Sequence, residues 1–140
     1  MRILIAVDGS VISTRAVRFV LQRWPMRAGD PEITLINVDM PLSAHVEGYL
    51  DAMALAKFHA TNATRALRTA RRLMAAAGRN PEEMIVVGEP GEEIVRAAHK
   101  RRAQLIVMGS RGHGALGSLM LGSVVLKVLA HSRIPVLVVR

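Results

Sequence analysis

Short apolar runs alternate with longer amphipathic segments along the whole chain. The apolar runs have the length and β-branched content of buried strands, and they predict strands at 3–7, 33–38, 84–87, 105–108 and 136–139. Between them, apolar residues recur at helical spacing, which predicts helices near 10–24, 50–77, 90–102 and 123–131. Residues 40–50 fit neither period and are predicted to be an irregular connection, either a lid over a ligand or a plain long loop.

Local signals agree with these helix boundaries. Pro25 ends the first predicted helix, and Gly78 suits the C-cap of the second. Acidic residues at the start of the third helix and basic residues at its end complement the helix dipole.

The alternation of strand and helix predicts the fold class. Right-handed βαβ crossovers require a parallel sheet with helices on both faces. The sequence shows no linker or internal repeat, so we expect one α/β domain over residues 1–140.

A glycine-rich stretch follows the predicted strand 105–108. Five glycines lie within fourteen residues, namely Gly109, Gly112, Gly114, Gly117 and Gly122. Glycine has no Cβ, so the main-chain amides of such a loop can approach a ligand closely. The next helix directs its positive end at the same place, and a phosphate is the natural ligand there.

The spacing Gly109-x2-Gly112-x9-Gly122-Ser123 resembles the G-x2-G-x9-G-[S/T] signature of the nucleotide-binding branch of the universal stress protein family. The first strand with its terminal Asp8 (R-I-L-I-A-V-D-G-S) and the ending I-P-V-L-V-V resemble that family too, so the likeness covers essentially the whole chain. It implies an open five-stranded parallel sheet of order 3-2-1-4-5, Rossmann-like and similar to the adenine nucleotide alpha hydrolases. In that order strands one and four meet at the switch point, where open α/β sheets bind ligands.

The resemblance also implies a nucleotide site in the crevice between strands one and four. Its expected residues are Ala6, Asp8, Val38, Met108, Gly109, Ser110, Arg111, Gly112, His113, Gly114, Ala115, Gly122, Ser123, Val124 and Val125. Asp8 would contact adenine or ribose, or else cap the first helix. Val38 would pair with the adenine edge through its main chain, while Ala6 and Met108 would line the base pocket or simply belong to the core.

The phosphate end of this site depends on the glycine loop. Gly122 and Ser123 begin the last predicted helix, where free amides and a hydroxyl can bind an anion, and Arg111 can neutralise phosphate charge or face solvent. Family members often carry Thr where this chain has Val125, so one hydroxyl contact is missing. The alternative is that the glycines only form a turn and Ser123 only caps a helix.

Composition narrows the class of protein. Hydrophobic residues make up 51% of the 140, but no apolar run reaches the roughly 18 to 20 residues of a membrane span. Met1-Arg2 leads straight into the first predicted strand, with no signal peptide pattern, and there is no cysteine for a disulfide or thiolate site. We therefore expect a cytoplasmic protein.

The formal net charge of +8 raises the question of a nucleic-acid partner. The densest helical set of basic residues is Arg65, Arg68 and Arg72, opposite an apolar stripe, and a solvated helix face is the favoured interpretation. Four scattered aromatic residues do not make a base-stacking platform, so the sequence disfavours nucleic acid.

Other motifs do not support an enzyme. Gly112-x-Gly114-x-x-Gly117 matches the dinucleotide fingerprint but does not follow a first strand, and no Walker motif is present. The five histidines lack metal-ligand spacing, and no nucleophile, acid or base pattern appears.

The sequence thus predicts a universal stress protein that binds ATP with Mg²⁺ as a sensor or switch, with slow hydrolysis at most. The apolar strand 136–139 would be an unprotected sheet edge, which predicts a homodimer through that strand. The alternatives are a stress-response interaction module without nucleotide binding, and a weak ATPase on the same fold.

Overall fold

A computed structural model describes residues 1–25, 29–112 and 121–140. In chain order the described elements are β1 (Arg2–Ala6), α1 (Val11–Arg23), β2 (Glu32–Asp39), α2 (Ala44–Glu47), α3 (Ala52–Ala76), β3 (Glu82–Val87), α4 (Pro90–Lys100), β4 (Leu105–Gly109), α5 (Ser123–His131) and β5 (Val136–Val139). Every strand and helix predicted from periodicity is present, with ends within a few residues of those expected.

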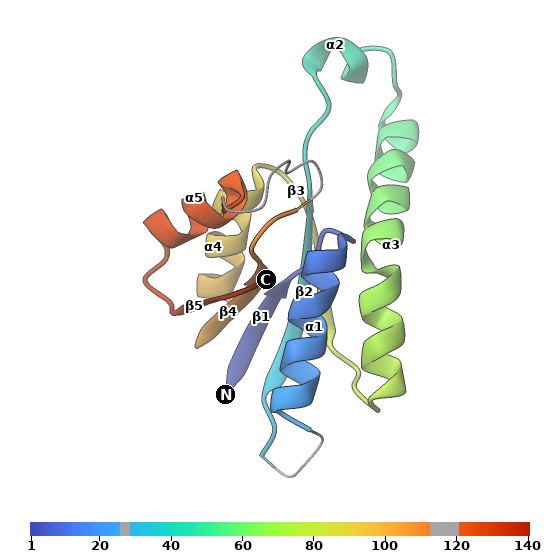
Figure 1. The fold of residues 1–140 in the computed structure, drawn as a ribbon. Helices are drawn as coiled ribbons and strands as arrows, with labels where there is room; N and C mark the ends of the chain where they lie inside the picture. Colours follow the sequence, from blue (N-terminus) through green and yellow to red (C-terminus); the bar gives the residue numbers. More distant parts are fainter. Residues whose placement is uncertain (26–28, 113–120) are drawn as a thin grey trace.

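The five strands form one parallel sheet in the order β3-β2-β1-β4-β5 (Figure 1). The predicted order 3-2-1-4-5 is therefore confirmed. From β1 the chain moves outward to β2 and β3, and from β4 it moves to β5 on the other side. The neighbouring strands β1 and β4 consequently form the switch point of the sheet.

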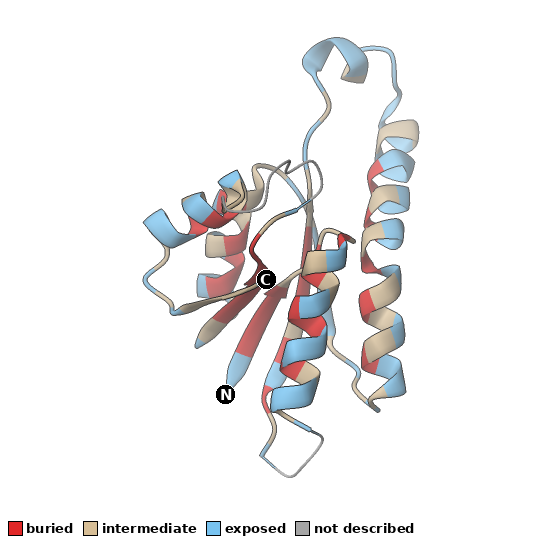
Figure 2. Ribbon diagram, viewed as in Figure 1, coloured by how far each residue is buried: buried red, intermediate tan, exposed pale blue. Residues whose placement is uncertain are grey.

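Helices cover both faces of this sheet, as Figure 2 shows from the red inner sides of the ribbons. α1 and α3 pack on one face, where Ile5, Val17 and Leu67 belong to one buried cluster. α4 and α5 pack on the other, where Leu4 and Val128 belong to a second. Because β1 is buried on both faces, its residues after the exposed Arg2 are apolar without alternation.

The helix boundaries follow from capping chemistry. The Ser10 hydroxyl caps α1 by accepting a hydrogen bond from Ser13 N–H at 3.1 Å. At the C-terminus of α3, Gly78 has φ +67°, and Arg79 N–H donates to Met74 O at 2.9 Å, which is a Schellman motif. The C-cap of α3 is Ala77, and Gly78, predicted as the C-cap, is the left-handed residue directly after it.

The prediction of an irregular segment at 40–50 was wrong in part. A single helical turn, α2, lies within it, capped by Ser43, whose Oγ accepts from Val46 N–H at 3.4 Å. One turn of four residues is too short to produce a helical period in the sequence. In Figure 1, α2 and the first turns of α3 extend beyond the carboxyl edge of the sheet.

None of the helices in the described ranges has the length and apolar character that crossing a membrane requires.

Candidate functional site

The strands end at different heights at the carboxyl edge of the sheet. Ala6, the last residue of β1, pairs with Ile36, whereas β2 continues to Asp39. β4 ends beside β1 at Gly109. The end of β2 therefore has no strand beside it on the β1 side.

The main chain of Val38 faces this side. Ile36 O accepts from Val7 N–H at 2.8 Å on the β1 side, and Asp39 O accepts from Gly88 N–H at 2.9 Å on the β3 side. Because main-chain groups alternate in direction along a strand, those of Val38 point the same way as those of Ile36. They lie past the last residue of β1, where they can pair with the edge of a planar ring.

Asp8 lies just after β1, at the same edge. Its Oδ1 accepts from Ser10 N–H at 2.9 Å, so the carboxylate is held at the turn into α1. Ser10, not Asp8, is the N-cap of α1. A methyl group added at Gly112 would lie 2.5 Å from Asp8 Oδ2, so the main chain of Gly112 lies directly against this carboxylate.

The two halves of the glycine signature meet in space, although nine residues separate them. Gly122 N–H donates to Ser110 O at 2.9 Å and closes the loop. A methyl group at Gly122 would lie 3.4 Å from Arg111 Cα and 3.8 Å from Gly112 N. Asp8, Gly112 and Gly122 therefore lie next to one another.

Among the described residues, no side chain caps the main-chain amides at the start of α5. Gly122 is the N-cap and makes no side-chain cap bond, and the first helical bond runs from Leu126 N–H to Gly122 O at 3.0 Å. The amides of Ser123, Val124 and Val125 precede that bond, and Ser123 is exposed. Such a helix end attracts an anion. The alternative in which Ser123 only caps the helix was wrong, because it is the first helical residue.

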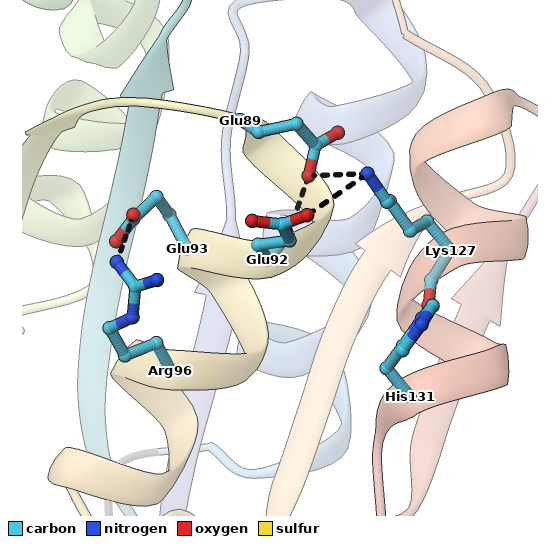
Figure 3. A network of polar contacts seen from close by, with 6 residues as sticks. All are labelled: Glu89, Glu92, Glu93, Arg96, Lys127 and His131. Atoms are coloured by element: carbon cyan, nitrogen blue, oxygen red, sulfur yellow. Dashed lines mark hydrogen bonds and ion pairs between the residues drawn. The ribbon is translucent and has the colours of Figure 1, made fainter.

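The N-terminus of α4 differs, because the protein's own carboxylates already occupy it (Figure 3). Glu89 accepts from Glu92 N–H at 2.8 Å, and Lys127 Nζ lies 3.3 Å from Glu89 Oε2 and from Glu92 Oε1. Desolvation works against ionisation of Glu89, yet the bonds from Glu92 N–H and Lys127 keep its pKa below the ordinary value. Of these two helix ends, the described side chains occupy that of α4 and not that of α5.

Several expected site residues have their side chains in the core. Met108 and Val125 are 4% and 2% exposed and pack between the sheet and the helices α4 and α5, with Ala6 beside them. Ser110 is buried, and its N–H donates to Val139 O at 2.7 Å. These side chains therefore belong to the packed interior next to the glycine-rich segment.

Packing against α1 explains why residue 109 is a glycine. A methyl group there would lie 2.8 Å from Ile12 Cγ2 and 3.0 Å from Ser13 N, so the first turn of α1 needs a glycine at this point. Arg111, shortly after β4, and Val124, in the first turn of α5, are both half-buried. The expected site residues His113, Gly114 and Ala115 lie outside the described residues.

A polar cluster that sequence reasoning missed lies next to this edge. Asp39 Oδ2 lies 2.7 Å from His59 Nδ1 and accepts from Asn62 Nδ2 at 2.9 Å, which ties α3 to the end of β2. Asn37 is buried, and its Nδ2 donates to Val7 O at 2.8 Å. The sequence signal that could have revealed Asp39 is its position directly after an apolar run predicted to be a strand. Asp8 shows the same signal.

A surface hollow lies at the opposite, amino edge of the sheet. It is lined by Arg2, Glu32, Ile33, Thr34, Asn80, Glu82 and Arg101. Arg101 and Glu82 form an ion pair across it. It contains none of the predicted site residues.

The fold and this edge define the class of protein: an open α/β protein whose switch point carries an acidic residue, a glycine-rich segment and a helix N-terminus that no described side chain caps. The comparisons with known proteins agree. The sequence model described as "Universal stress protein family" matches residues 1–140. The chain therefore belongs to the universal stress protein family.

Individual relatives cover almost the whole chain. The universal stress protein in the QAH/OAS sulfhydrylase 3′ region of Thermus aquaticus is 35% identical over 139 residues, 99% of this chain and 97% of its own. The solved structure of protein MJ0577 of Methanocaldococcus jannaschii has a TM-score of 0.83 at 30% identity, covering 99% of this chain and 94% of its own. A universal stress protein solved in complex with cAMP has a TM-score of 0.72 at 29% identity, covering 100% and 97%.

Proposed function

We propose that this universal stress protein binds an adenine nucleotide, ATP in particular, between β1 and β4 and acts as a nucleotide-dependent switch in a stress response. The observation that carries the proposal is that Asp8, Gly112 and the uncapped start of α5 lie side by side. The relative solved with cAMP supports an adenine ligand on this fold.

Each part of the nucleotide has a matching group. The amides of Ser123, Val124 and Val125 would bind phosphate oxygens, and the absence of a side chain at Gly112 leaves room beside Asp8. The main chain of Val38 would pair with the adenine edge. The buried Val125 side chain is no obstacle, because a main-chain amide serves the phosphate whatever the side chain is.

Mg²⁺ would come with the triphosphate. In the described ranges no three His, Asp or Glu side chains lie close enough together to hold a metal ion. The ion would be coordinated mainly by phosphate oxygens, with Asp8 as the nearest acidic side chain. It would neutralise part of the negative charge of the triphosphate. This proposal involves binding and switching, with slow hydrolysis at most.

We further propose that the protein is cytoplasmic and forms a homodimer through β5. β5 is the last strand of the sheet on its side, and its four residues are apolar. A second copy of the same edge would continue the sheet.

Calorimetric titration of ATP into the protein and its Gly122→Val variant tests the nucleotide site. Gly122 has φ −65° and ψ 152°, which valine adopts without strain, so the variant should keep the fold. Its isopropyl group would enter the space in front of the α5 amides. We expect binding by the original protein and a loss of at least about tenfold, or about 1.4 kcal/mol, in the variant.

Gly122→Ala is the graded control, with a smaller loss, and circular dichroism verifies folding of both variants. AMP and cAMP titrated in parallel show which phosphates contribute. Failure of the original protein to bind any of the three nucleotides would overturn the proposal, and so would equal affinity of the valine variant.

A further inference from the structure

Two helices of this protein, α1 and α3, carry basic residues without any acidic ones and hold eight of the 19 basic residues of the chain. Within Val11–Arg23 and Ala52–Ala76 there is no Asp or Glu, although the chain has eleven. The basic residues there are Arg15, Arg18 and Arg23 on α1, and Lys57, Arg65, Arg68, Arg71 and Arg72 on α3. α4, on the other face of the sheet, instead balances Glu92 and Glu93 against Arg96 and Lys100.

Five of these arginines point away from the sheet. α1 buries Ala16, Val17 and Val20, and α3 buries Leu67, Ala70 and Met74. At 3.6 residues per turn the opposite sides carry five exposed arginines, here called the arginine face: Arg15, Arg18, Arg65, Arg68 and Arg72. In Figure 2 the outer sides of both helices are accordingly coloured as exposed.

The two helices are in a register that joins these arginines into one cluster. A methyl group at Gly9, before α1, would lie 2.9 Å from Ala66 Cα, and Arg79 Nη2, after α3, donates to Trp24 O at 2.7 Å. Gly9 lies two residues before α1, and Trp24 and Arg79 follow directly or shortly after the ends of α1 and α3, so the two helices run side by side with an offset of about 55 residues. This offset places Arg15 beside Arg72 and Arg18 about one turn further along the pair of helices. The arginine face thus spans roughly 14 Å along the helices, at about 1.5 Å per residue, and one helix spacing of about 8–10 Å across.

The protein provides no counter-charge for this surface. Throughout the described ranges, which include every Asp and Glu of the chain, none of the five arginines forms an ion pair. The nearby acids are engaged elsewhere: Glu83 pairs with Arg71, and Asp30 pairs with Arg79 at 2.6 Å. Five like charges at this spacing repel one another, and a polyanion would relieve that repulsion.

We propose that the arginine face binds the phosphate backbone of a nucleic-acid duplex without reading its sequence. Guanidinium groups bind phosphate in bidentate fashion, and the exposed neighbours Gln22, Thr61 and Thr64 are further hydrogen-bond donors for phosphate and sugar oxygens. Insertion at a lipid surface would need an exposed apolar helix face, whereas α1 and α3 pack theirs against the sheet and leave only single apolar side chains such as Phe19 among the arginines of α1. The shortage of aromatic residues argues against binding by stacking on the bases of a single strand. Binding to the phosphate backbone of a duplex does not require aromatic residues.

Fluorescence anisotropy with a labelled 24-base-pair DNA duplex, and with an RNA duplex of the same sequence, tests the proposal. At three to five phosphate contacts, log K should fall with log[NaCl] with a slope of about −3 to −5. A second, unrelated duplex sequence should bind equally well. The DNA and RNA arms show which backbone geometry the face prefers.

The matched variants are Arg65→Gln/Arg68→Gln on the face and Lys100→Gln/Arg133→Gln on exposed positions elsewhere. Both remove two charges, and glutamine preserves helix propensity. The face variant should bind at least about tenfold more weakly, with a slope less steep by about 2, whereas the control should change less than about twofold. Equal loss in both variants, no duplex binding at 50 mM NaCl, or binding to phosphatidylserine vesicles in place of duplex would overturn the proposal.

Discussion

Glycines at the candidate site serve different physical purposes. Gly9 has φ +84°, and a methyl group there would collide with the main chain of Ala66, so its absence of a side chain serves folding. Gly112 makes room for the Asp8 carboxylate. Gly122 has an ordinary extended conformation and only van der Waals neighbours. Among these three glycines, Gly122 is the one whose substitution should weaken ligand binding without lowering the stability of the fold.

Arg102 is the described non-glycine residue in the left-handed region, with φ +50°. It follows α4 in a Schellman motif, in which Ala103 N–H donates to Ala98 O at 2.9 Å. A side chain in this conformation costs about 1–2 kcal/mol. Glycine would avoid that cost but would lose more entropy on folding.

We expect Arg102→Gly to raise the free energy of unfolding by about 0.5–1 kcal/mol, measured by urea denaturation. Lys100→Gly, two positions earlier and inside α4, is the control and should lower it by a similar amount. Destabilisation by both substitutions would show that the left-handed conformation carries no strain here.

At the scale of elements, side-chain ties hold α3 to the sheet. Arg71 on α3 binds Glu83 on β3 in bidentate fashion, with Nε–Oε1 at 2.8 Å and Nη2–Oε2 at 2.6 Å. The hydrogen bond from Arg71 lowers the pKa of Glu83 from its ordinary value of 4.5. The pair therefore stabilises the fold when Glu83 is ionised.

The stability of the protein should depend on pH through this pair. Because the pKa of Glu83 is lower in the folded state, its contribution is complete above the unfolded value and is lost as pH falls through the folded value. Arg71→Gln should lower the unfolding free energy at pH 7 by up to about 1 kcal/mol, since the pair is partly exposed. The difference from the original protein should persist to about pH 5.5 and shrink well below pH 4.5.

Urea denaturation at pH 7, 5.5 and 3.5 measures that difference. Arg72→Gln is the control, because Arg72 is exposed on the next position of α3 and pairs with none of the acids. A pH-dependent loss of the same size in Arg72→Gln would assign the effect to net charge and not to the Glu83 pair.

At the scale of the whole molecule, the two edges of the sheet differ. β3 begins with Glu82 and Glu83, which pair with Arg101 and Arg71, and such charges discourage pairing with another chain. β5 is V-L-V-V and has no charged side chain. The asymmetry favours β5 as the edge at which two copies meet.

Val138→Pro should convert the proposed dimer into a monomer. Pro135 O accepts a bond from Ile106 in β4 and Val139 O accepts one from Ser110 just after β4, so the main chain of Val136 and Val138 points to the open side. Proline at 138 removes an outward N–H without breaking the β4 ladder. Sedimentation should show twice the chain mass for the original protein and for the control Val138→Thr. A monomeric original protein, or a dimeric proline variant, would contradict the β5 interface.

The sequence alone determined the elements and their class. Burial of each element against the sheet repeats with the element's own period, so apolar runs and helical stripes located the strands and the longer helices. The single turn α2 left no such period. The strand order was predicted from the resemblance to a family and not from periodicity. The period of an element shows which of its sides is buried, but it does not show which other element lies beside it.

The tertiary structure decided what lies next to what. The Asp8–Gly112–Gly122 arrangement, the direction of the Val38 main chain and the Asp39–His59 contact join residues far apart in the chain, which meet only because the crossovers bring the strand ends to one edge. Likewise, the arginines of α1 and α3 form a single face only through the packing register of the two helices. Such proximity is a property of packed elements, and no local pattern of residues encodes it.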